Sequence, residues 1–438
     1  MIPSLVVALV AVSQGSAAPT AAPPASRPIA PPVAAPAARA SNAPAVAGPA
    51  GAPNVDEAIA RSVEELLTMQ EVGATRIGAT DGPAEWPYEG VYRVAGQIPI
   101  GYRVGGTSIV AMALMTAPGY EKDARRQAAV ANACRFVCAA ADDPLMNPDY
   151  DGGYDVRGWG HSYGLQFLLR LAATNAIPEG QADEVGKRTK QYLAALQQVE
   201  IPQVGGWNYA RAPQRQPSPA SPFMTAPALQ TLFEAKRQGL PVDDAVVERG
   251  LAALERCRTQ SGAFAYSAKA DATNAKDGTP GAVGRMLVSE TTLLLAGRSD
   301  IAKVRGALDA FIAHWDRLEE RRAKDGTHKP PFNVAPYYFY YAHLAAAQAI
   351  ELLPPHERPE YRRKFLELLF RTRGDDGRWN DRVFPRTANY GTSCAVMSLC
   401  APQATPPTKW TGGGAIGAAE GPGGRDAEAA TQGKQARP

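Results

Sequence analysis

The predicted fold is decided by the stretch Gln203-Val-Gly-Gly-Trp207-Asn-Tyr209, which leads through a proline-rich loop into the apolar run 223–233. Two glycines before a tryptophan are costly inside a helix, so a helix must end there and the indole ring must pack against that end. A second helix begins after the prolines. The unit is therefore a helix, a glycine-aromatic turn, a loop and a second helix.

The same unit recurs along the chain. The clearest further copies are the turns Gly262-Ala-Phe264 and Gly377-Arg-Trp379, each of which lies between two apolar helical segments. Weaker copies surround Trp86, Tyr154 and Phe332. Five intervals separate Trp86 from Trp379, so the period is roughly 59 residues, slightly longer than common helical repeats. We therefore predict six helix pairs in tandem.

These turns resemble the prenyltransferase and squalene-oxidase repeats of squalene-hopene cyclases and protein prenyltransferase beta subunits. The resemblance also rests on Tyr390-Gly391-Thr392-Ser393, which would open the last inner helix, and on the aromatic run 337–341. It covers residues 55–400 and implies an all-α fold, an (α/α)6 toroid whose six inner helices surround a central cavity. The family's turn reads Gln, three residues, Gly, any residue, Trp, whereas Gln203 is only two residues before Gly205.

The chain ends differ in composition from this repeat region. The short apolar run 5–12 and the small residues after it are typical of a secretory signal, and the run is too short to span a bilayer. We predict a signal peptide over 1–18, an Ala/Pro-rich linker over 19–53, the toroid over 54–401 and a disordered tail over 402–438. The protein is expected to be secreted, periplasmic or tethered near the cell envelope, without a transmembrane segment.

Charge and cysteine content exclude two classes of protein. A net charge of +3, with basic and acidic residues mixed, does not favour nucleic acid as a partner. Five cysteines without regular spacing do not indicate a disulfide framework. Cys134 and Cys138 lie one helical turn apart, where they could ligate a metal or pack as free thiols in the core. We predict no metal site and no cofactor.

The densest group of reactive side chains lies between Asp149 and His161. Carboxylates beside a histidine can perform general acid-base chemistry, and we predict Asp155, Arg157 and His161 as catalytic residues. The alternative is a glycine-rich connecting loop whose aspartates form turns. The start of every inner helix should lie at one rim of the ring, so residues of other helices are expected to join this site. The predicted ligand-binding residues are Asp151, Tyr154, Trp159, Tyr163, Glu290, Tyr337, Tyr341 and Thr392.

Each of these further residues also has a structural interpretation. Tyr337 and Tyr341 are one helical turn apart and could face the cavity together, but aromatic packing between helix layers would also explain them. Thr392 is expected to cap a helix, because its hydroxyl can accept from an unpaired amide. Glu290 could pair with Arg285 on the same helix.

The chemistry of the best-known relatives is missing from this chain. The Asp-x-Asp-Asp acid of the cyclases is absent, the zinc ligands of the prenyltransferases cannot be matched, and the Cys-Gly-Glu-Gln of thioester domains does not occur. Two hypotheses remain. The first is a module that binds an unknown small-molecule, peptide or glycan ligand in the central cavity. The second is a divergent enzyme, a terpenoid cyclase-like isomerase or a carbohydrate-active lyase or hydrolase. A cyclase needs an aromatic, water-poor pocket with one acid of raised pKa, whereas a glycan enzyme needs two facing carboxylates.

Overall fold

The computed structural model describes residues 54–72, 84–149, 156–209, 219–267, 278–324, 326, 329 and 334–412. The chain divides into two units, 1–51 and 52–438, and the second holds every described helix. The predicted signal peptide and almost all of the predicted linker belong to the first unit, outside the described residues. Apart from isolated bridges, the described part of the chain contains no strands.

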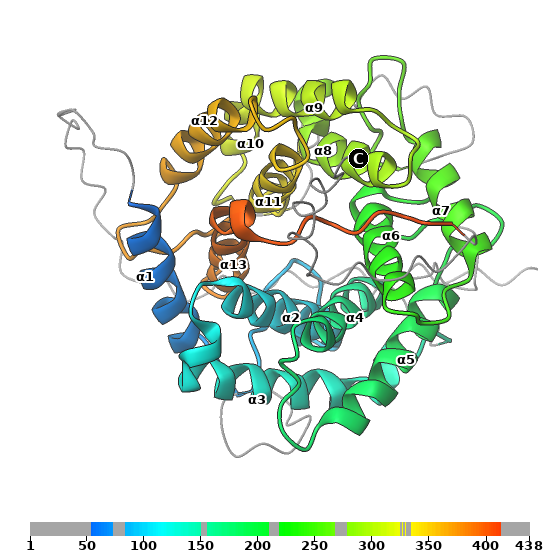
Figure 1. Ribbon diagram of the computed structural model, residues 1–438, viewed down its shortest axis with the longest axis vertical. Helices are drawn as coiled ribbons and strands as arrows, with labels where there is room; N and C mark the ends of the chain where they lie inside the picture. Colours follow the sequence, from blue (N-terminus) through cyan, green and yellow to red (C-terminus); the bar gives the residue numbers. More distant parts are fainter. Residues whose placement is uncertain are drawn as a thin grey trace, which may run out of the picture. The chain divides into compact units, whose positions relative to one another are not determined.

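The helices form two concentric layers (Figure 1). The inner layer consists of α2 (Ile100–Thr116), α4 (Arg157–Ala173), α6 (Pro222–Arg237), α8 (Thr279–Leu295), α11 (Tyr338–Ile350) and α13 (Thr387–Leu399). The outer layer consists of α1 (Val55–Thr68), α3 (Ala124–Ala140), α5 (Ala182–Gln198), α7 (Asp244–Arg256), α9 (Ile301–Ala313), the short α10 (Trp315–Glu319) and α12 (Arg358–Phe370). Each inner helix contacts the next, and α13 contacts α2, so the ring is closed. The predicted (α/α)6 toroid is confirmed.

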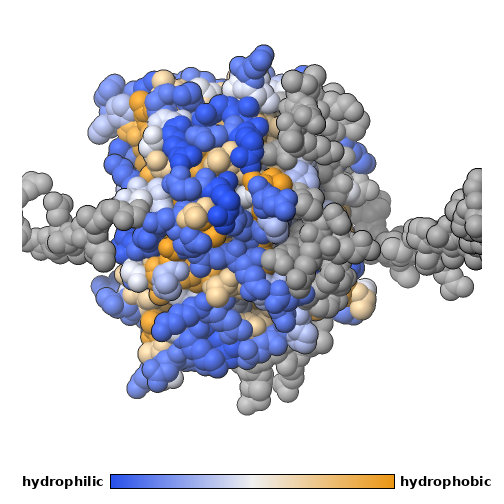
Figure 2. Space-filling view, turned by 90° about the vertical axis from the view of Figure 1, so that its right-hand side faces the viewer, coloured by the Kyte–Doolittle hydropathy of each residue, from blue (hydrophilic) through white to orange (hydrophobic). Residues whose placement is uncertain are grey.

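The sequence of each helix matches its layer. In α2 every residue from Ile100 to Leu114 is buried, as expected of a helix covered on all sides. The outer helix α1 instead buries one stripe that includes Ile59, Val63 and Leu66, and it turns its charged residues outward. The face shown in Figure 2 is accordingly mostly hydrophilic.

The tryptophan turns join the two layers through hydrogen bonds that recur in three copies. In each copy the indole N–H donates to a carbonyl in the last turn of the preceding outer helix. These pairs are Trp86 with Leu66 (2.7 Å), Trp207 with Leu196 (2.8 Å) and Trp379 with Leu369 (3.1 Å). The backbone amide of each tryptophan donates to a threonine hydroxyl of an inner helix. The acceptors are Thr107 (2.9 Å), Thr225 (3.0 Å) and Thr392 (3.1 Å).

These bonds correct the prediction for the threonines. Thr392 was expected to cap its helix, but it lies inside α13 and holds the turn through Trp379. Its hydroxyl, which was also predicted to contact a ligand, is fully buried in that bond. Each indole packs on the end of the preceding helix, as the sequence analysis predicted. The carbonyls there are available as acceptors, because they have no partner within the helix.

The two ends of the repeat region meet where α1 packs on α13. Three ion pairs span this junction: Glu57–Arg373 (3.1 Å), Glu65–Arg378 (2.6 Å) and Glu71–Arg386 (2.7 Å). The sequence pattern pairs each outer helix with the inner helix that follows it, whereas in the structure α1 packs mainly on the last inner helix. Closure therefore depends on residues more than 300 positions apart.

The described chain continues to Gly412, ten residues beyond the predicted start of the disordered tail. The Trp410 amide donates to the Leu295 carbonyl (2.9 Å), and its ring packs on Phe233 with 5.3 Å between centroids. Figure 1 shows this segment crossing from α13 to α6. The five cysteines are buried free thiols. Within the described ranges, none of the helices has the length and apolar character that crossing a bilayer requires.

Candidate functional site

Helix α4 divides the predicted site between its two faces. Residues two apart on a helix point about 200° away from each other, so Trp159 and Tyr163 share one face while Arg157 and His161 share the other. Trp159 and Tyr163 contact each other inside the ring, with 5.0 Å between centroids. The predicted catalytic Asp155 and the predicted ligand residues Asp151 and Tyr154 lie outside the described residues.

Inside the ring, aromatic side chains from different inner helices touch one another. Trp159 of α4 packs on Tyr102 of α2 (5.7 Å between centroids) and on Tyr390 of α13 (6.3 Å), and Tyr88 contacts all three. We call Tyr88, Tyr102, Trp159, Tyr163 and Tyr390 the interior aromatic cluster. Gly105 makes room for it, because a Cβ at that position would lie 2.3 Å from the Trp159 ring.

A second group of rings lies across the ring interior. Phe223 of α6 packs on the predicted ligand residues Tyr337 (5.1 Å) and Tyr341 (4.5 Å). The structure thus places both tyrosines against the same ring, and their predicted contact with a ligand stays a prediction. Tyr92 and Tyr209 connect this group to the cluster, with centroid distances of 6.4 Å from Tyr92 to Tyr102 and 6.4 Å from Tyr92 to Tyr209. Tyr92, Tyr163 and Tyr337 keep part of their surface exposed.

The sequence analysis missed Asp381, the buried carboxyl beside this cluster. It is fully buried and forms no close hydrogen bond within the described part of the chain, although the Thr387 hydroxyl and the Asp381 backbone amide lie near enough to lower its pKa. Burial raises the pKa of Asp381 to about 7, although the positive charge of Arg382 opposes the shift. Burial is the largest cause of the raised pKa of Tyr88 and of Cys394, and the Asp381 carboxyl is the second, which places the carboxyl near both side chains.

A signal for Asp381 was present in the repeat. The residue two positions after the turn aromatic is a tyrosine in three copies, namely Tyr88, Tyr209 and Tyr266, and it is Asp381 in the last. Tyr88 and Tyr209 both point into the aromatic interior. A carboxyl at an interior position that otherwise holds a phenol is expensive to bury, so this departure makes Asp381 a candidate functional residue.

The remaining buried carboxylates of the described chain are paired. Glu85 pairs with Arg103 (2.6 Å), and Glu200 pairs with Arg249 (2.6 Å). The predicted ligand residue Glu290 pairs with Arg258 (2.7 Å), not with Arg285. Asp381 is therefore the one fully buried carboxyl in the described ranges that forms no salt bridge.

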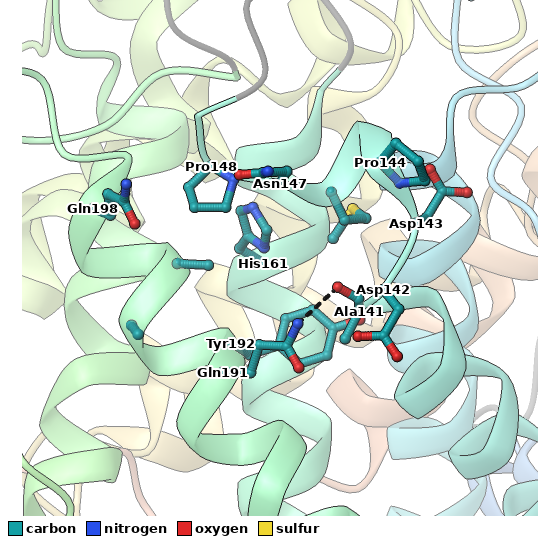
Figure 3. Close-up of a pocket in the computed structure, with 13 residues that line it drawn as sticks. Ala141, Asp142, Asp143, Pro144, Asn147, Pro148, His161, Gln191, Tyr192 and Gln198 are labelled. Atoms are coloured by element: carbon teal, nitrogen blue, oxygen red, sulfur yellow. Dashed lines mark hydrogen bonds between the residues drawn. The ribbon is translucent and has the colours of Figure 1, made fainter.

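His161 lines a pocket of about 440 Å³ between α3, α4 and α5 (Figure 3). The ring is 2% exposed, and neither nitrogen has a hydrogen-bond partner within the described residues. Burial, followed by the positive charge of Arg157, lowers the pKa of His161 to about 3. The Arg157 guanidinium itself donates to the Asn147 carbonyl (2.9 Å).

This pocket lies away from the predicted central cavity, and its presence does not test that prediction. The second described pocket, about 330 Å³, is lined by residues that include Arg322, Thr372 and Arg378. Neither of these two pockets is lined by the interior aromatic cluster. In the described ranges, no group of three or more His, Cys, Asp and Glu side chains is arranged to hold a metal ion.

Comparison with solved structures identifies the fold. An unsaturated glucuronyl hydrolase from Streptococcus agalactiae superposes with a TM-score of 0.51 and 10% identity, over 80% of this chain and 93% of that one. Dfg5 from Chaetomium thermophilum, in complex with glucosamine, gives 0.48 and 14% over 82% and 93%. A type II terpene cyclase from Scytonema gives 0.45 and 13% over 80% and 99%.

No family model matches the chain, and no curated protein matches it either. At 10% identity the hydrolase match shows the fold alone, and a fold does not by itself imply a function. The chain is an alpha-alpha toroid, as the sequence repeat predicted.

Proposed function

We propose that the ring interior binds an apolar ligand and that Asp381 protonates it, as in a terpenoid cyclase-like isomerase. The observation that carries this proposal is the fully buried Asp381 carboxyl, which forms no salt bridge in the described chain and lies next to aromatic rings. With a pKa of about 7, the carboxyl keeps its proton in slightly acidic solution. A protonated acid in a dry site is what proton transfer to a weak base such as an alkene requires.

The aromatic side chains support the second half of this reaction. The Asp381 O–H bond breaks as a C–H bond forms on an alkene carbon, so a carbocation remains on the ligand. The faces of Trp159, Tyr102 and Tyr390 are electron-rich and attract such a cation. Loss of a proton from a neighbouring carbon to the Asp381 carboxylate restores the acid, and the net reaction is an isomerisation or cyclisation.

The paired carboxylates argue against glycan hydrolysis in the interior. That chemistry uses two carboxyl groups on opposite sides of the bond. Glu85 and Glu290 are bound to arginines, which leaves Asp381 as a lone acid among the described interior residues. Binding of an apolar ligand without turnover is the outcome that we expect if Asp381 does not act as an acid.

The test uses purified protein in D2O with squalene and geranylgeraniol as probes. We expect products that carry deuterium at one carbon, and we expect Asp381→Asn to lower their rate of formation about 10²- to 10⁴-fold, the range for a general acid. Gly186→Ala on α5, where an added Cβ meets no neighbouring atom, is the control and should retain activity. Products without deuterium, or equal rates in wild type and Asp381→Asn, would refute the acid role.

Export is a separate proposal, which rests on the apolar run 5–12 and the Ala/Pro-rich stretch after it. The N-terminal sequence of the protein isolated from the producing cells tests it. A mature chain that begins near residue 19 supports export and a tether, whereas a chain that keeps Met1 in the cytoplasm contradicts them.

A further inference from the structure

The two buried histidines of the described chain differ in their surroundings. His343 is fully buried, and both of its ring nitrogens are satisfied, since Nε2 accepts from the Trp315 indole (2.9 Å) and Nδ1 lies 2.8 Å from the Phe339 carbonyl. His161 is equally buried, but neither ring nitrogen has a partner within the described residues. Buried polar groups are almost always hydrogen-bonded, so the nitrogens of His161 point to a missing partner.

The missing partner has room in the pocket between α3, α4 and α5. The volume of about 440 Å³ lies within the range of small-molecule sites. Figure 3 shows the imidazole between the Asn147–Pro148 segment and the helix that carries Gln191. The pocket lies outside the ring interior, on the face of α4 opposite Trp159.

The protonation state of His161 limits the chemistry of the ligand. With its pKa lowered to about 3, the ring is neutral and presents one N–H donor and one nitrogen acceptor. A ligand that offers both a donor and an acceptor, such as a hydroxyl group, matches it. A carboxylate or phosphate could use only the N–H.

The other polar side chains around the pocket include two carboxylates and three amides, Asp142, Asp143, Asn147, Gln191 and Gln198. Asp142 is held by Arg188, and Asp143 accepts from the Leu145 amide (2.8 Å), so both carboxylates are fixed at the pocket. Among the described lining residues there is no lysine and no arginine. Hydroxyl groups of a ligand can donate to the free lone pairs of these oxygens.

Apolar groups supply the remaining walls. They are Ala141, Pro144, Met146, Pro148, Ala194 and Ala195. A sugar ring combines hydroxyl groups along its edge with C–H faces that pack on such walls. From this geometry we infer that the pocket between α3, α4 and α5 is a binding site for a neutral polyol, a single sugar ring, with His161 as its central hydrogen-bonding residue.

The experiment labels the histidine ring nitrogens of the full chain with ¹⁵N and adds glucose, mannose and galactose in turn. The ring signals that are absent from the spectrum of His161→Gln belong to His161, and we expect at least one of these hexoses to shift them in wild type. We expect His161→Leu to weaken binding about tenfold or more, because one buried hydrogen-bonding group is lost. His161→Gln, which keeps a donor and an acceptor, should weaken it less.

Controls separate this site from folding defects and from the ring interior. His161→Leu should unfold at a temperature equal to or above that of wild type, because it removes an unsatisfied group, while His343→Gln should unfold at a lower temperature. Asp381→Asn should bind the hexose as wild type does, so the polyol site and the acid role of Asp381 can fail independently.

Three results would overturn the polyol site. The first is that none of the three hexoses shifts a His161 signal. The second is that His161→Leu binds as tightly as wild type. The third is that glucuronate or glucosamine binds more tightly than the neutral sugars, which would assign the pocket to a charged ligand.

Discussion

The interior of the ring and the pocket outside it each contain a buried ionisable group, and burial moves the two pKa values in opposite directions. The pKa of the Asp381 carboxyl rises to about 7, and that of the His161 imidazole falls to about 3. Both groups are therefore uncharged in slightly acidic solution, one as a proton donor and one as a donor-acceptor pair. The same cause, loss of hydration, produces an acid in one region and a neutral recognition group in the other.

The comparison also shows why the two regions suit different ligands. Aromatic rings surround Asp381, so its neighbours favour an apolar molecule and a developing positive charge. Carboxylates and small apolar residues surround His161, so its neighbours favour a neutral molecule with hydroxyl groups. Helix α4 separates the two regions, with Trp159 on one face and His161 on the other.

The largest expected effect concerns Asp381. Its folded pKa of about 7 lies above the unfolded value, so the stability that the neutral carboxyl provides is present below about pH 4 and is lost as the pH rises to 7. Asp381→Asn removes this dependence. Its free energy of unfolding relative to wild type should rise by roughly 3 kcal/mol between pH 5 and pH 8, as measured by urea denaturation. If the free energies of unfolding of the two proteins change equally with pH, Asp381 is already ionised in the folded state.

The contribution of His161 to the free energy of unfolding should change with pH in the opposite direction. Its folded pKa of about 3 lies below the unfolded value, so its contribution is present above about pH 6.5 and is lost as the pH falls. Between pH 7 and pH 5 the free energy of unfolding of wild type should decrease by roughly 2 kcal/mol relative to His161→Leu. If the free energies of unfolding of the two proteins decrease equally between pH 7 and pH 5, the imidazole is hydrated or bound to a partner and its pKa is not lowered.

A smaller effect is expected from the glycine that lets the interior aromatic cluster form. Gly105→Ala places a Cβ 2.3 Å from the Trp159 ring, which must shift. Overpacking of this kind costs about 1 to 2 kcal/mol, measurable as a lower unfolding temperature. The rate of the reaction that depends on Asp381 should fall as well, whereas hexose binding at His161 should stay unchanged. Gly186→Ala on α5, where no atom lies within 4 Å, is the matched control.

The smallest effect is expected at the junction that closes the ring. Arg378→Gln breaks the pair with Glu65, which is partly exposed, so the free energy of unfolding should fall by about 0.5 kcal/mol or less. The loss should shrink in high salt. The pH dependence that Asp381 and His161 produce should not change, because neither side chain takes part in the junction. If this variant loses the pH dependence of unfolding that Asp381 causes, then closing the ring at α1 and α13 determines whether Asp381 is buried.

The repeat could be predicted from the sequence because the residues that end each helix act on neighbours along the chain. Two glycines and an aromatic residue end a helix through contacts with residues about ten positions away, as with Trp207 and Leu196. The helix pairs and the all-α class follow from that pattern. Glu290 and Thr392 were singled out by residue type, and the structure gives each a bond within the fold.

The sequence alone determined the tandem helix pairs and the residues that punctuate them, since helix periodicity and turn chemistry depend on neighbours along the chain. Only the tertiary structure decided that α1 closes on α13, that Trp159 and His161 lie in separate regions, and that Asp381 is a buried acid. Those properties arise from contacts between distant segments, such as Tyr88 with Tyr390, and the pKa of a side chain depends on which groups and how much water surround it.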